Sequence, residues 1–83
     1  MPIEFYIAAL HNWVLSDAVN SADEKDVDRV FEVELDILDY EYAHGLIADC
    51  DVSPDYIAPS EVLTEDKLKT RIINALNSVG VQL

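Results

Sequence analysis

The chain has no lysine or arginine between Val30 and Asp66, a window that holds eleven acidic residues. These acids are Glu32, Glu34, Asp36, Asp39, Glu41, Asp49, Asp51, Asp55, Glu61, Glu65 and Asp66. All five basic residues lie outside the window, so most of its acids are expected to have no basic neighbour, and the net charge of −12 is concentrated in mid-chain. A field of this sign repels nucleic acid and anionic membranes, and it attracts basic surfaces.

Three further shortages exclude whole classes of protein. The single cysteine, Cys50, excludes an internal disulfide framework and favours a reducing cytosol. With only Gly45 and Gly80, the chain has no glycine-rich phosphate-binding loop. No apolar run approaches the roughly 20 residues of a membrane span, and no signal-peptide pattern opens the chain. We therefore expect a cytoplasmic protein that does not contact a membrane.

The length and composition indicate one small folded domain, residues 1–83. A hydrophobic content of 51% argues against disorder, which combines high charge with low hydrophobicity. A domain of this size buries only about 60–65% of its unfolded surface, so its stability is marginal. Oligomerisation, including a homodimer, therefore stays open.

Both ends of the chain have apolar residues at helical spacing. Residues 3–19 are predicted to form the first helix. Thr64 is the predicted N-cap of the last helix, and Gly80 its left-handed C-cap. Pro54 and Pro59 predict a surface loop over residues 51–59. The predicted buried face of the last helix consists of Leu68, Ile72, Ala75, Leu76 and Val79.

The middle of the chain supports two interpretations. Ser21 and Glu24 have the spacing of a capping box, which predicts a helix starting near Ala22. Residues 31–37 alternate apolar and acidic side chains like a strand, yet Phe31 and Leu38 also fit a helix and no Gly or Pro interrupts it. We favour helix, with a break near residues 36–39 and a further helix through residues 40–49. The predicted fold is mainly α, a bundle of about four helices, and the alternative is an α+β fold with a strand at residues 31–37.

Residues that could support catalysis or metal binding occur in unsuitable patterns. Residues 49–55 resemble the start of a calcium loop, but Pro54 replaces the required Gly and Ser60 replaces the bidentate Glu. Cys50 and His44 lack an orienting third group, and the surrounding acids disfavour a thiolate. Cys50 is therefore interpreted as a packed side chain. We predict no enzymatic activity, no cofactor and no metal.

The acids of the predicted middle helix are spaced so that they can imitate a nucleic-acid backbone. A helix rises about 1.5 Å per residue, so acids three or four residues apart stand about 5–6 Å apart on one face. Glu32, Asp36 and Asp39 have this spacing, and Glu34 and Glu41 are two turns apart. Such rows can present carboxylates where a DNA-binding protein contacts phosphates.

Three tyrosines lie among these acids, and tyrosine amid charge is typical of protein interfaces, although it is also common at the edge of a core. The predicted partner is a basic protein, such as a nucleic-acid-binding protein or a nuclease complex, and the chain itself is not expected to bind nucleic acid. The predicted partner-binding residues are Glu32, Glu34, Asp36, Asp39, Glu41, Asp49, Asp51, Asp55, Tyr40, Tyr42 and Tyr56.

The order of these segments resembles that of the Ocr-type bacteriophage anti-restriction proteins. The resemblance rests on residues 36–48 (DILDYEYAHGLIA), between an acidic helix and an acidic loop, and on residues 69–76 (KTRIINAL). It implies a small helical DNA mimic that blocks a restriction or CRISPR-type defence protein in the cytoplasm of a phage host. The alternatives are an immunity protein or antitoxin that neutralises a basic nuclease toxin, and a plain oligomerisation module.

Overall fold

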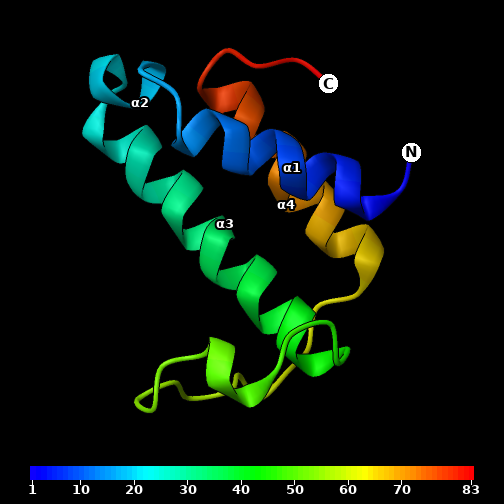
Figure 1. Cartoon of the computed structure of the whole chain (residues 1–83). Helices are drawn as coiled ribbons and strands as arrows, with labels where there is room; N and C mark the ends of the chain where they lie inside the picture. The colour runs from blue at the N-terminus through cyan, green and yellow to red at the C-terminus, as the bar shows by residue number, and fades with distance from the viewer.

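The computed structural model describes all residues, 1–83, as four α-helices and one 3-10 turn, with no strand. The helices are α1 (Ile3–Val14), α2 (Ala18–Ser21), α3 (Glu24–Ala43) and α4 (Glu65–Ser78), and the turn is η1 (Asp49–Asp51). Figure 1 shows α1 and α4 on one side of α3, with the loop of residues 44–64 at the far end of α3. The mainly α prediction is confirmed. No helix combines the length and the hydropathy needed to cross a membrane.

The long helix α3 forms because its apolar residues match a helical period. Val33 and Ile37 are buried, whereas Phe31 and Leu35 are exposed on the opposite side. A strand would have placed all four side chains on one face, because its side chains alternate with a period of two. The strand alternative is therefore wrong. The predicted break at residues 36–39 is also wrong, since α3 is continuous from Glu24 to Ala43.

Two glycines end the two longest helices in the same way. Gly45 has φ 70° and Gly80 has φ 85°, a left-handed conformation that costs glycine little. After α3, the Leu46 amide donates to the Glu41 carbonyl at 2.8 Å, and after α4 the Val81 amide donates to the Leu76 carbonyl at 2.9 Å. Both ends are Schellman motifs. The prediction for Gly80 is confirmed, and the predicted helix through residues 40–49 is wrong because Gly45 ends it.

The N-terminal helices are shorter than the sequence pattern predicts. The Ser16 hydroxyl donates to the Trp13 carbonyl at 2.7 Å, and α1 ends at Val14 rather than near residue 19. Ser21 is the last residue of α2, so it does not form the predicted capping box with Glu24. The helix α3 begins at Glu24 instead, with Asp23 as an N-cap that makes no side-chain hydrogen bond.

One hydrophobic cluster joins α1, α3 and α4. Its 11 buried residues are Ile3, Leu10, Trp13, Val30, Val33, Ile37, Tyr40, Leu68, Ile72, Ala75 and Leu76. Each large aliphatic side chain buried in this way contributes about 1.5–3 kcal/mol. The predicted N-cap of α4 is confirmed, because the Thr64 hydroxyl accepts a hydrogen bond from the Lys67 amide at 3.3 Å. No residue between 41 and 67 is among these 11, and Leu63 is the one loop residue that packs against them, which leaves polar contacts to position the rest of the loop.

Candidate functional site

Two basic residues of α4 reach acids outside that helix, one of them distant in the sequence. The Arg71 guanidinium lies 3.0 Å from a carboxylate oxygen of Asp36 in α3, and the Lys67 amine lies 3.6 Å from Glu61. The expectation that the acidic window lacks basic neighbours is therefore corrected: the folded chain supplies them from α4. Asp36 is partly shielded by Arg71, so it is a weaker candidate for partner binding than its spacing suggested.

The acids of α3 do not form a single row. Glu34 points toward α1, where its carboxylate lies 3.3 Å from the His11 ring, and Asp36 points toward α4. Glu32 is exposed and makes no ion pair. Because each residue advances a helix by 100°, Asp36 lies within about 40° of Glu32, whereas Glu34 lies about 160° from Asp36. The spacing predicted for Glu32, Asp36 and Asp39 therefore holds, since all three lie on one face of the continuous helix α3.

Two tyrosines attach the loop to the end of α3. The Tyr56 hydroxyl donates to the Asp39 carboxylate, and the Tyr42 hydroxyl donates to Asp49 at 2.7 Å. Their rings meet edge to face with centroids 5.6 Å apart. The hydrogen bond to Asp39 raises the pKa of Tyr56 to about 12, and the bond to Asp49 raises the pKa of Tyr42. The loop is thus held by hydrogen bonds to charged acceptors, which are among the stronger kind.

The third predicted tyrosine has a different place. Tyr40 is buried in the core cluster, and its ring lies against His44 with a centroid separation of 4.2 Å. Its side chain therefore packs inside the protein and is not presented to a partner. Of the three tyrosines predicted to bind a partner, only Tyr42 and Tyr56 lie beside the surface acids.

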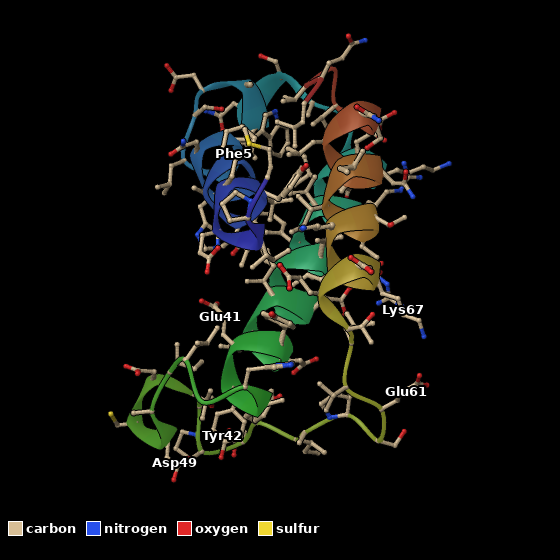
Figure 2. The ribbon with its side chains drawn as sticks, turned by 90° about the vertical axis from the view of Figure 1, so that its right-hand side faces the viewer. Phe5, Glu41, Tyr42, Asp49, Glu61 and Lys67 are labelled. Atoms are coloured by element: carbon tan, nitrogen blue, oxygen red, sulfur yellow. The ribbon has the colours of Figure 1, made fainter.

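Five acids lie in the last turns of α3 and in the loop that follows it, and we call them the acidic end: Asp39, Glu41, Asp49, Asp51 and Asp55. None of the five makes an ion pair, and Asp51 accepts a hydrogen bond from the Ala48 amide at 2.9 Å. Figure 2 places Glu41, Tyr42 and Asp49 together at this end, on the other side from Glu61 and Lys67. The structure therefore places five predicted residues at one end of the molecule, none of them in an ion pair, although Asp39 also lines the hollow that contains Lys67 and Arg71.

The structure also places the remaining chemically reactive groups. Cys50 is exposed in η1, so its interpretation as a packed side chain is wrong; the few apolar residues of the loop build no core around it. No three His, Cys, Asp or Glu side chains are arranged to hold a metal ion. A hollow between α3 and α4 is lined partly by Asp36, Lys67 and Arg71, which are all in ion pairs.

Sequence reasoning missed a second feature of α3. Phe31 and Leu35 are 44% and 63% exposed, although Phe31 and Leu38 fit the helical spacing expected of a buried stripe. The period was visible in the sequence, but which of two apolar stripes faces the core was not.

Comparisons with known protein families, with curated proteins and with solved structures found no match.

Proposed function

We propose that this protein is an acidic DNA mimic, which binds the nucleic-acid-binding surface of a basic partner protein and blocks it. The observation that carries the proposal is the acidic end: five carboxylates, none of which makes an ion pair within the chain. The resemblance to the anti-restriction family suggests a restriction or CRISPR-type defence complex as the partner class.

Most Lys and Arg side chains form ion pairs outside the acidic end, and this supports the acidic end as the surface that binds the partner. Four of the five Lys and Arg side chains already lie near a carboxylate: Arg29 near Asp26, Lys67 near Glu61, Lys69 near Glu65, and Arg71 near Asp36. The excess negative charge therefore remains where no such pairing occurs. A surface of this kind speeds association with a basic protein, and salt weakens the attraction because the Debye length is only about 8 Å at physiological ionic strength.

The hydrogen bonds at the acidic end support binding in a second way. Asp39, Asp49 and Asp51 each accept a hydrogen bond on one carboxylate oxygen from the protein itself. The second oxygen of each makes no hydrogen bond within the chain, so it can accept from Lys or Arg of a partner. Holding these carboxylates in place before binding lowers the entropy that association costs.

The experiment compares two variants that lose the same charge at opposite ends of the molecule. Glu41→Gln with Asp55→Asn removes two acids of the acidic end that make no side-chain bond. Asp17→Asn with Asp23→Asn is the control near α2, where neither side chain makes a capping bond. Partners are captured from a bacterial lysate at low salt, and their affinities for each purified variant are then measured.

We expect the first variant to bind a captured partner at least about tenfold more weakly, because each lost contact between opposite charges removes part of the association energy. The control should bind like the unchanged protein. Equal losses in both variants would mean that only the total charge matters, and an affinity unaffected by salt would refute the proposal.

A further inference from the structure

The outward side of α3 carries an apolar stripe that is exposed at Phe31 and Leu35 and partly covered at Leu38 and Tyr42. Phe31, Leu35, Leu38 and Tyr42 follow one another at intervals of four, three and four residues. This is the spacing of the d and a positions of two heptads, the pattern by which one helix packs along another. Figure 1 shows α1 and α4 on one side of α3 and no element along the other. We call these four residues the outer stripe.

Acids occupy both edges of the outer stripe. In the same heptad register, Glu32 and Asp39 fall at e positions, and Glu34 and Glu41 fall at g positions. Side chains at e and g flank a helix–helix contact and set the choice of partner through their charges. Phe31, Leu35, Glu32 and Glu34 together line one surface hollow with Asp28, so the acids directly border the apolar side chains.

The end of α1 widens the apolar surface on one edge. Leu15 is 85% exposed, and it lines a neighbouring hollow together with His11, Val14 and Glu34. Glu34 belongs to both hollows, so the two surfaces adjoin. At the other end, the Tyr42 hydroxyl donates to Asp49, which joins the outer stripe to the acidic end. One continuous surface thus offers apolar contacts along α3 and charge beside the loop.

We propose that the outer stripe docks an amphipathic α-helix of the partner protein, with apolar residues at heptad spacing and Lys or Arg along both edges. The inference rests on the proposed function, since it specifies how the same basic partner makes contact. The acids beside the outer stripe favour a basic helix over a second copy of the chain. A second copy of the chain would place Glu and Asp opposite Glu and Asp, which destabilises a helix pair, whereas basic edges complement all four acids.

The test uses three synthetic three-heptad peptides. The first has Leu at a and d and Lys at e and g; the second shuffles the same composition so that no apolar stripe forms. The third keeps Leu at a and d and carries Glu at e and g. Each peptide is titrated into the full chain and into two variants. Phe31→Ala with Leu35→Ala removes the exposed part of the stripe, and Leu46→Ala with Ile57→Ala removes two exposed apolar residues of the loop as the control.

We expect the first peptide to bind the unchanged protein and the loop control equally. It should bind the stripe variant at least about tenfold more weakly, since even partial loss of two buried apolar contacts exceeds 1.4 kcal/mol. The unfolding midpoint of the stripe variant should stay unchanged, because both side chains are exposed. Sedimentation should show a monomer.

Other outcomes separate the two proposals. Equal binding of the first and second peptides, or no effect of the stripe variant, would overturn the docking of a helix and leave the proposed function standing on charge alone. Equal binding of the first and third peptides would overturn the basic partner, and with it the proposed function. A dimer that dissociates in the stripe variant would identify a second copy as the occupant and overturn the inference.

Discussion

Leu35 and Ile37 lie two residues apart in α3, and comparing the stability cost of replacing each with Ala tests the fold. Both are large aliphatic residues in the alternating segment of α3, but Ile37 is 1% exposed and Leu35 is 63% exposed. Replacing Ile37 with Ala removes buried methyl and methylene groups and leaves a cavity, which costs about 2–5 kcal/mol. Replacing Leu35 with Ala should change the free energy of unfolding by less than about 0.5 kcal/mol, because its side chain is already in water and Ala favours a helix.

The magnitude matters because the whole domain is only marginally stable. At about 0.05–0.15 kcal/mol per residue, 83 residues give a free energy of unfolding of roughly 4–12 kcal/mol. Ile37→Ala therefore removes a large part of the stability. Urea unfolding followed by the fluorescence of Trp13, the single and buried tryptophan, measures the loss. With an m-value of about 1.5 kcal/mol/M, a loss of 3 kcal/mol lowers the midpoint by about 2 M.

An equal loss in the free energy of unfolding at the two positions would refute this reasoning. A strand at residues 31–37 would place Leu35 and Ile37 on the same face, so it predicts similar losses for both. A large cost at Leu35 alone would show that the outer stripe, rather than the inner one, faces the core.

Three further predictions follow from single contacts. Thr64→Ala should lower stability by about 1 kcal/mol because the Lys67 amide loses its acceptor; a denaturation curve identical to that of the unchanged protein would contradict the cap. Asp36→Asn should cost at most about 1 kcal/mol, and less in high salt, because the pair with Arg71 is partly exposed; a salt-independent loss of several kcal/mol would contradict a surface ion pair. The pKa of Tyr56 is raised above its ordinary value to about 12, so its attachment to Asp39 should be complete below about pH 10 and lost as pH rises toward 12. A spectrophotometric titration should show Tyr42 and Tyr56 ionising later than the other tyrosines, and Tyr56→Phe should remove the last ionisation, near pH 12. Ionisation of every tyrosine near pH 10 would contradict the bond.

The local signals of helix formation were mostly sufficient to predict the fold class. Thr64 and Gly80 marked the ends of α4 because a cap and a left-handed glycine act within a few residues. Gly45 carries the same signal for the end of α3, and the predicted helix through residues 40–49 conflicts with it. The alternation over residues 31–37 stayed ambiguous because α3 has two apolar stripes, and only packing against α1 and α4 selects the buried one.

The candidate site was less predictable, because charges interact through space. Asp36 meets Arg71 from 35 positions away, so its neutralising partner could not be found by scanning nearby sequence. Tyr40 and Tyr42 are two residues apart on α3, which turns one into the core and leaves the other beside Asp49. The acidic character of residues 39–55 was visible in the sequence, whereas the grouping of five of these acids at one end required the fold of the loop.

The central claim is that the acidic end occupies a nucleic-acid-binding surface, and competition with DNA tests it most directly. A captured partner is first bound to labelled duplex DNA, and the purified protein is then added while the release of the label is measured. The account predicts that the protein displaces the duplex, and that the Glu41→Gln, Asp55→Asn variant does so at least about tenfold less effectively. Formation of a ternary complex, with protein and duplex bound to the partner together, would contradict it.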